Sequence, residues 1–249
     1  AHWEPYSARK DFVGMFPEEL KSTDKPRHPF AASDFSDQSL REYRREYDEF
    51  IADVDEEFGK LLFSLEASGV LDNSYVIVTS DHGELFERGE QGHATALMFA
   101  PVTHIPLLIS APGQKTRSDF HSLTSNLDLL PTLLQIAGQE IPDRAEGRIL
   151  PGFGGTEDAS RSIFPMVAKD NAAFRPIKRG TFTLIKGSYE LFLFTGYPGH
   201  PDAFELYNLA EDPDELRDLF SKDITTASHM KDELLEAINA ANRNYQTKA

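Results

Sequence analysis

The chain has 249 residues, no cysteine and a formal net charge of −16. The absence of cysteine excludes disulfides, thiolate metal sites and a cysteine nucleophile within the chain. The negative charge argues against nucleic acid or an anionic membrane as a partner. A hydrophobic share of 40% and a charged share of 27% are ordinary for a globular α/β domain, alone or with a small appendage.

Residues 1 to about 35 are rich in Pro, Phe and charge and have no hydrophobic period. We expect them to run irregularly over the surface of a domain. The chain opens with Ala1-His2-Trp3 instead of an initiator Met, so we expect it to be the interior of a longer sequence.

From Ser36 to Leu65 apolar residues recur at steps of three and four, which predicts an amphipathic helix. Ser36 is a suitable N-cap and Gly69 a suitable stop. Acidic residues fall between the apolar positions, and we expect them to form a solvated face. They are Asp48, Glu49, Asp53, Asp55, Glu56 and Glu57.

Two short apolar runs follow, Tyr75 to Thr79 and Ile105 to Ile109. Each is typical of a strand buried on both faces, as in a parallel sheet. Leu127 to Ala137 is predicted to be a helix, with Pro131 in its first turn and Gly138 at its end. This order of elements indicates a doubly wound α/β domain.

Pro, Gly and charge dominate residues 141–160, which we interpret as a linker or a long surface loop. Four short β segments and a helix from about Thr226 to Asn242 come next, and they predict a small antiparallel sheet that carries one helix. The β segments are Ile163 to Ala168, Thr181 to Lys186, Tyr189 to Phe194 and Phe204 to Asn208. We therefore predict an α/β core over residues 1–150 and a small α+β subdomain over residues 151–249.

Asp81, His82 and Glu84 stand where the first predicted strand ends. Ligands bind at the carboxyl ends of strands in open α/β sheets. A carboxylate and an imidazole suit Zn, Mn or Fe, and Ca accepts one nitrogen in a carboxylate-rich shell. Gly83 could turn the chain so that both side chains reach one ion. The alternative is that Asp81 caps a turn and His82 is an ordinary polar loop residue.

An ordered set of segments surrounds this pair: YDEFIADVDEEFGKLLFSLEASGVLDNSYVIVTSDHGE, then GH, THIPLLISAPG, LDLLPTLLQIAG and FELYNLAEDPDELRDL. The set resembles the sulfatase branch of the alkaline phosphatase superfamily. The opening HWEPY is similar to a His-x-Pro-Tyr segment in the middle of these enzymes. The resemblance touches most of the chain.

The resemblance implies an alkaline-phosphatase-like α/β fold, present in part: a mostly parallel sheet between helices, with a small C-terminal antiparallel sheet and helix. Asp81 and His82 match the later pair of metal ligands, and calcium is the expected ion, with manganese or zinc as the alternative. His93 matches the Lys or His that contacts the substrate anion or the leaving-group oxygen. His2 matches a histidine that also reaches the substrate.

The family's nucleophile is a formylglycine made from Cys or Ser in a Cys/Ser-x-Pro-x-Arg motif, and the chain has no such motif. The earlier pair of acidic metal ligands also has no counterpart here. We expect both upstream of Ala1. The chain is then a fragment that binds metal weakly, is inactive alone and needs its own N-terminal half as a partner.

The resemblance favours the C-terminal part of a metal-dependent sulfatase that hydrolyses sulfate esters. A phosphoesterase, a phosphonate hydrolase or a phosphoglycerol-type transferase of the same superfamily is the alternative, with a phosphate-ester substrate. A non-catalytic interaction module is the third possibility. Substrate identity and oligomeric state are undetermined, and an exported or periplasmic location is favoured by the resemblance alone. His28, His121, His200 and His229 are expected at the surface, and His104 is expected to be structural at the entry of a strand.

Overall fold

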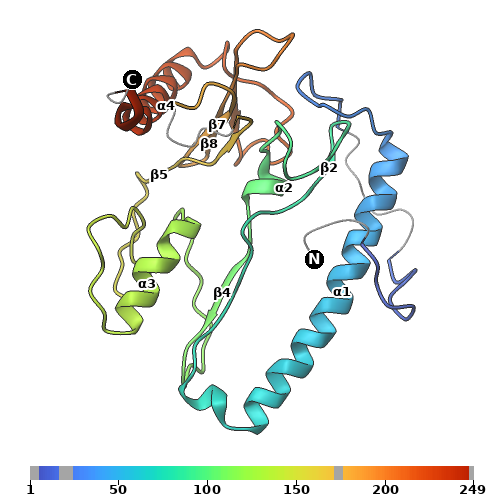
Figure 1. The fold of residues 1–249 in the computed structure, drawn as a ribbon, viewed down its shortest axis with the longest axis vertical. Helices are drawn as coiled ribbons and strands as arrows, with labels where there is room; N and C mark the ends of the chain where they lie inside the picture. The colour runs from blue at the N-terminus through green and yellow to red at the C-terminus, as the bar shows by residue number, and fades with distance from the viewer. Residues whose placement is uncertain (1–5, 17–24, 171–175, 247–249) are drawn as a thin grey trace. The chain divides into compact units, whose positions relative to one another are not determined.

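The computed structural model describes residues 6–16, 25–170 and 176–246, which form two compact units (Figure 1). Unit 1 is Ala1–Arg117 and unit 2 is Ser118–Ala249. Unit 2 therefore contains the helix that follows Leu127 together with the C-terminal strands. The sequence-based boundary at residue 150, which concerns the domains of the complete fold, stays a prediction. Among the described residues, no helix combines the length and the apolar character that crossing a membrane requires.

The long helix of unit 1 is α1 (Asp37–Ala67), as the sequence predicts. The Ser36 hydroxyl accepts a hydrogen bond from the Ser39 backbone N–H at 3.1 Å and so caps the first turn. The helix ends at Ala67, Ser68 is its C-cap, and Gly69 follows with a φ of 73°. A left-handed residue just after a helix is the usual way for the chain to leave it.

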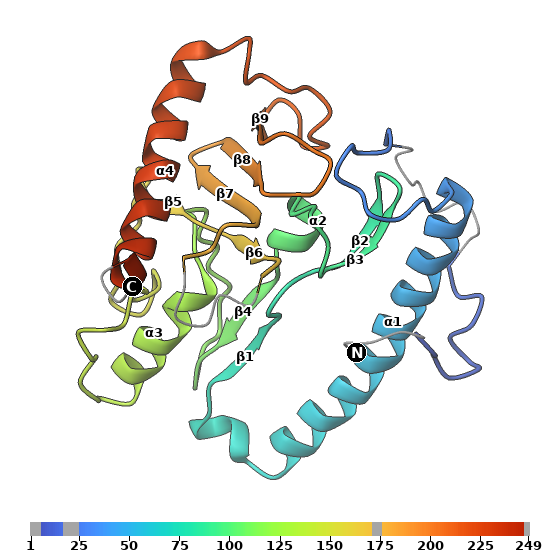
Figure 2. The same ribbon diagram turned by 45° about the horizontal axis from the view of Figure 1, so that its top comes forward.

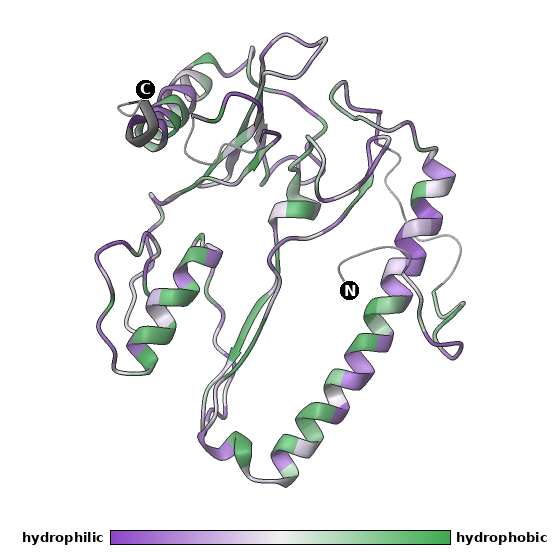
Figure 3. Ribbon diagram, in the orientation of Figure 1, coloured by the Kyte–Doolittle hydropathy of each residue, from purple (hydrophilic) through white to green (hydrophobic). Residues whose placement is uncertain are grey.

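The solvated acidic face predicted for α1 is wrong at two positions. Glu49 and Asp53 are buried, because the segment before the helix lies on them. The Gly14 N–H donates to Glu49 at 2.8 Å and the Arg9 N–H donates to Asp53 at 2.9 Å. Conversely, the predicted apolar residue Ile51 is 47% exposed. Apolar residues continue along the C-terminal half of the helix (Figure 3).

After the short 3₁₀ helix η1 (Val70–Asn73), strand β1 (Val76–Thr79) pairs with β4 (Leu107–Ser110). The sequence locates both strands but is wrong about their surroundings. They are antiparallel, and the facing pair Val78 and Leu108 is exposed instead of buried. Residues 80–106, all described, fold into a hairpin and the one-turn helix α2 (Ala100–Thr103). They lack the long crossover that parallel neighbours require.

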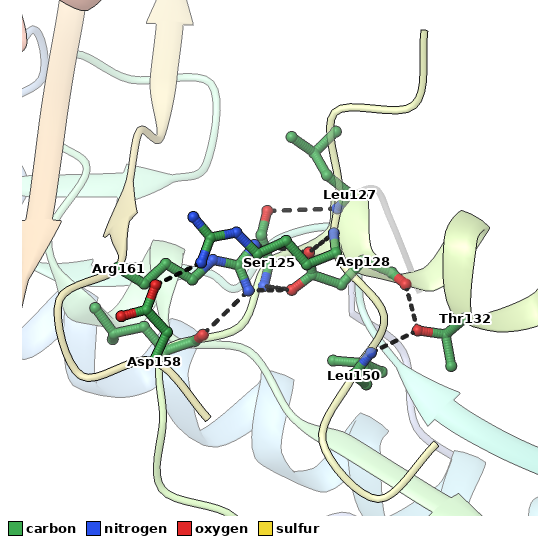
Figure 4. Close-up of polar contacts among 9 residues, drawn as sticks. Ser125, Leu127, Asp128, Thr132, Leu150, Asp158 and Arg161 are labelled. Carbon is green, nitrogen blue, oxygen red and sulfur yellow. Dashed lines mark hydrogen bonds and ion pairs between the residues drawn. The ribbon is translucent and has the colours of Figure 1, made fainter. Parts of the chain in front are cut away.

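Unit 2 begins with the 3₁₀ turn η2 (Asn126–Asp128) and the helix α3 (Leu129–Ile136), which confirms the predicted helix and its stop near Gly138. Asp128 is fully buried where the two meet. Its carboxylate accepts two hydrogen bonds from the Arg161 guanidinium, at 2.6 and 2.7 Å (Figure 4). It also accepts from the backbone N–H groups of Ser125 and Arg148, each at 2.8 Å.

These bonds fasten the loop that the sequence marks as a linker. Burial by itself would raise the pKa of Asp128, but the hydrogen bonds from Arg161, Arg148 and Ser125 outweigh it and lower the pKa. Thr132 extends the network, because its hydroxyl donates to the Asp128 carbonyl and accepts from the Leu150 N–H (Figure 4). Removing one partner of a buried ion pair of this kind costs about 3–5 kcal/mol.

The C-terminal sheet contains five strands, and every pairing in it is antiparallel. They are β5 (Ser162–Ile163), β6 (Met166–Ala168), β7 (Gly180–Lys186), β8 (Tyr189–Thr195) and β9 (Ala203–Asn208). Helix α4 (Ile224–Gln246) lies along one face (Figure 2). The predicted antiparallel sheet with one helix is therefore confirmed. The buried core between them consists of Phe182, Leu184, Leu191, Leu193, Leu206, Ala227, Met230 and Leu234.

A buried pair of carboxyl groups belongs to the same unit. Glu190 of β8 and Glu215 are each 1% exposed. The pKa of Glu190 is raised well above its ordinary value, first by burial and then by the charge and the hydrogen bond of Glu215. Burial and the neighbouring acid both favour the protonated form of Glu190, so Glu190 keeps its proton in the folded state at pH values where a free glutamate has released it.

This proton makes the stability of unit 2 depend on pH. The unfolded chain releases it above about pH 4.5 and the folded chain only above the raised pKa, so opening becomes easier as the pH rises between these values. We expect Glu190→Gln, which keeps a hydrogen-bond donor without the charge, to flatten the dependence. Hydrogen exchange of the β8 amides, corrected for intrinsic exchange, measures it. The control Glu236→Gln, on the exposed side of α4, should keep the wild-type slope.

Candidate active site

The turn that follows β1 is held by close backbone contact with α2. The N–H groups of Gly83 and Glu84 donate to the carbonyls of Val102 and Pro101, at 2.8 and 3.0 Å. A Cβ on residue 83 would lie 2.0 Å from the Pro101 oxygen. The chain bends at Asp81, and Gly83 does not adopt the left-handed conformation expected of it; glycine is required there by the close approach to Pro101.

Asp81 and His82 stand side by side where the chain leaves β1. The His82 backbone N–H donates to the Asp81 carboxylate at 3.1 Å, and its ring Nε2 lies 3.7 Å from the other carboxylate oxygen. The His82 Nδ1 lies 2.8 Å from the Gly83 carbonyl oxygen, which can only accept. Nδ1 therefore carries the proton, and Nε2 is the ring nitrogen suited to a metal.

His93 reaches the same place through a hairpin that the sequence did not reveal. Strands β2 (Leu85–Glu87) and β3 (Glu90–Gly92) pair antiparallel with Leu85 opposite Gly92. The next pair along is Glu84 and His93, whose Oε2 and Nδ1 are 3.0 Å apart. The His93 ring stacks on the His82 ring, with centroids 3.9 Å apart and planes at 22°.

The hairpin turn requires left-handed backbone at two consecutive residues, Arg88 with φ 59° and Gly89 with φ 78°. Such two-residue turns match the twist of the strands they join. The strain at Arg88 is offset by its side chain, which lies buried with its guanidinium carbon 3.8 Å from the centre of the Phe99 ring. Its Nε also donates to Glu87 at 3.1 Å.

The structure thus brings three of the four predicted site residues together, Asp81, His82 and His93. His2 lies outside the described residues, so its role stays a prediction. The expectation that His28 is at the surface is wrong: it is buried, and its backbone N–H donates to the Arg88 carbonyl at 3.0 Å. The sequence did not predict the contact of Glu84 with His93. The pair Arg88-Gly89 between two short segments was the sequence signal for the hairpin that brings Glu84 and His93 together.

Asp81 and His82 offer one carboxylate and one imidazole to a metal ion. Throughout the described part of the chain, no group of three or more acidic or histidine side chains could hold one. Zinc takes about four ligands and calcium about six to eight. The donor chemistry fits a metal, since Asp81 is 74% exposed at its side chain and the His82 tautomer puts the lone pair of the ring on Nε2. Further ligands must come from elsewhere.

Comparison with known proteins identifies the family. The model of the family "Sulfatase" matches residues 2–139, more than half of the chain. The chain belongs to the sulfatase family. A second model, "N-sulphoglucosamine sulphohydrolase, C-terminal", matches residues 89–243. Together the two matches extend from before Asp81 and His82 to within α4.

Among curated relatives, Arylsulfatase K of Xenopus laevis is 30% identical over 187 residues, which is 73% of this chain and 34% of the relative. Two solved structures are also similar. BT4656 in complex with its substrate D-glucosamine-2-N,6-O-disulfate is 25% identical, with a TM-score of 0.62 over 84% of this chain and 42% of that one. The phosphonate monoester hydrolase of Agrobacterium radiobacter is 26% identical, with a TM-score of 0.67 over 85% and 44%.

These likenesses confirm the predicted fold class. The chain has the alkaline-phosphatase-like α/β fold of sulfatases and phosphonate hydrolases, with small antiparallel sheets among its helices. It spans about a third of the length of the Arylsulfatase K relative, at 34%.

The close approach at Gly83 can be tested by adding one methyl group. We expect Gly83→Ala to break the hydrogen bonds to Pro101 and Val102, because the new Cβ cannot occupy the position of a carbonyl oxygen. Amide hydrogen exchange at residues 83 and 84 should accelerate by at least about tenfold, which corresponds to the roughly 1.4 kcal/mol of one lost hydrogen bond.

The matched control is Gly59→Ala within α1, where an added Cβ meets nothing within 4 Å. Alanine favours a helix over glycine by about 1 kcal/mol, so this variant should be unchanged or more stable. Unchanged protection at residues 83 and 84 in Gly83→Ala would contradict the packing described for the turn.

Proposed function

We propose that this chain forms the later part of a metal-dependent sulfatase that hydrolyses sulfate esters. The observation that carries the proposal is the grouping of Asp81, His82 and His93 at the end of β1 in a member of the sulfatase family. The complete protein would be a sulfuric ester hydrolase. Relatives with this activity in their names support that view.

Asp81 and His82 would hold the ion through a carboxylate oxygen and Nε2. We propose calcium, with manganese or zinc as the alternative, because a carboxylate with one imidazole suits all three. A bound cation would gather the negative charge of the sulfate oxygens. The Gly83 carbonyl fixes the His82 ring, and the His82 backbone N–H holds the Asp81 carboxylate, before any ion arrives.

His93 would serve the leaving-group side of the ester. A histidine next to the bridging oxygen stabilises the charge that develops there or supplies a proton. Its ring stacks on the ring of His82, a proposed metal ligand, with the ring centroids 3.9 Å apart. His2 would reach the substrate from another direction, as the family resemblance implies.

The attacking group and the remaining metal ligands would come from residues outside this chain. The 249 residues contain neither cysteine nor a Ser-x-Pro-x-Arg motif from which a formylglycine is made. Unit 1 also exposes apolar side chains that a folded enzyme would cover, including Val78 at 36%, Leu108 at 62% and Phe63 at 72%. We propose that the N-terminal half of the same protein completes the site and packs on part of this surface.

One observation favours a second candidate. The phosphonate monoester hydrolase of Agrobacterium radiobacter is about as similar to the chain as BT4656, whose substrate is a disulfate, at 26% and 25% identity. Sulfate esters and phosphonate monoesters both present anionic oxygens to a cation and a leaving group to a histidine. A phosphoesterase or phosphonate hydrolase is therefore the alternative, and a non-catalytic interaction module is the third.

Kinetics of the complete gene product test the proposal. With an aryl sulfate as substrate, Asp81→Asn and His82→Ala should each lower kcat/KM by at least about 100-fold. Loss of a residue that only orients a metal ligand typically costs about 10- to 100-fold, and loss of the ligand itself costs at least as much. Asp55→Asn, on an exposed part of α1, should leave the rate unchanged. The 249-residue chain by itself should show no turnover.

Each other outcome points to a different conclusion. Faster turnover of an aryl phosphonate than of the aryl sulfate by the complete protein would replace sulfatase with phosphonate hydrolase. No turnover of any ester by a folded, metal-loaded protein would favour the interaction module. Turnover by the 249-residue chain alone would contradict the need for residues outside it.

A further inference from the structure

Glu84 is a buried carboxylate that faces a histidine instead of solvent. Its side chain is 7% exposed, and its Oε2 lies 3.0 Å from Nδ1 of His93. The backbone of Glu84 is fixed by the hydrogen bond from its N–H to the Pro101 carbonyl. In the register of the hairpin, His93 lies directly opposite Glu84. Both ends of the contact are therefore held by the fold.

This contact determines which nitrogen of His93 carries a proton. A carboxylate oxygen is an acceptor, and this contact assigns Nδ1 of His93 as its donor. Nε2, on the far side of the ring, is then the atom that can serve a ligand. His82 has the same arrangement, with its Nδ1 donating to the Gly83 carbonyl. The two stacked rings thus both hold the Nδ1–H tautomer.

We propose that Glu84 is a positioning residue for His93. It fixes the ring by accepting from Nδ1–H, so that the proton given to the leaving-group oxygen of the ester comes from Nε2 of the charged ring, and the neutral ring left behind is the Nδ1–H tautomer. The inference rests on the function proposed above, and it adds a residue to that site. The competing explanation is structural: Glu84 accepts a hydrogen bond only because a buried carboxylate needs one, and His93 happens to provide it.

The first test follows the ring itself and needs no activity. In the complete gene product with ¹⁵N-labelled histidine, the ring nitrogens of His93 should show a protonated Nδ1 and an unprotonated Nε2 when the imidazole is neutral. Glu84→Ala should shift this signal toward the Nε2–H form or a mixture. Glu84→Gln should largely restore it, because the amide oxygen can still accept from Nδ1. An unchanged tautomer in Glu84→Ala would overturn the proposal.

The second test is the dependence of the rate on the leaving group. Across aryl sulfates made from phenols of decreasing acidity, Glu84→Ala should lower kcat most for the poorest leaving group, by about 10- to 100-fold. His93→Ala should show the same trend, and the double variant should be little worse than His93→Ala. KM should change far less than kcat, since the residue orients a group that acts in the transition state.

Glu90→Gln is the matched control on the same hairpin. Glu90 is also buried, at 2% exposed, but it accepts hydrogen bonds from the backbone N–H groups of Ala32 and Ser33, at 2.7 and 3.2 Å. Its loss should lower stability and leave the leaving-group trend intact. If Glu84→Ala slows all esters equally, as a structural variant does, the proposal is overturned. If the wild type hydrolyses no sulfate ester, the proposed function fails, and the ring-nitrogen measurement alone decides the role of Glu84.

Discussion

The site depends on one close contact, the backbone of Gly83 lying against the carbonyls of Pro101 and Val102. There is no room for a side chain at residue 83, where a Cβ would lie 2.0 Å from the Pro101 oxygen. Because the chain is fixed here, Asp81 and His82 leave β1 in a defined direction and β2 begins two residues later. The hairpin then returns His93 to the His82 ring. A change at a residue with no side chain therefore affects every side chain of the site.

In this chain of net charge −16, several buried acidic side chains accept hydrogen bonds that offset the cost of burying them. Glu84 accepts from a histidine, Glu90 from backbone amides, and Asp128 from Arg161 and two backbone amides. Glu90 and Asp128 each join segments 33 or more residues apart, so these buried charges also hold the fold together. Glu190 differs, because its neighbour Glu215 is also an acid and both this acid and burial favour the protonated form of Glu190. Acidic residues therefore organise much of the interior of both units.

The sequence predicts the elements whose signals are local. Capping at Ser36, the left-handed Gly69 and the period of apolar residues predict α1, and alternation with turn residues predicts the C-terminal strands. Long-range pairing is not encoded locally, so the antiparallel pairing of β1 with β4 was missed. Burial of Glu49 and Asp53 was missed for the same reason, since the covering segment lies some 35 to 44 residues earlier.

The candidate site shows the same division. Asp81 and His82 are adjacent in sequence, and a strand end with a family resemblance is enough to select them. His93 came from the resemblance, but its stacking on His82 and its contact with Glu84 depend on a turn in which Arg88 adopts a left-handed φ of 59°. Such a conformation is uncommon for a residue with a Cβ, and here the packing of Arg88 on Phe99 and its hydrogen bond to Glu87 offset the strain.

The central claim is that Asp81 and His82 ligate a metal ion in a sulfatase active site. Anomalous diffraction from crystals of the complete gene product, with elemental analysis of the same sample, tests it most directly. The account predicts one ion, with a carboxylate oxygen of Asp81 and Nε2 of His82 in its coordination shell. An ion bound by other residues, or an ion-free site in protein that still hydrolyses a sulfate ester, would contradict it.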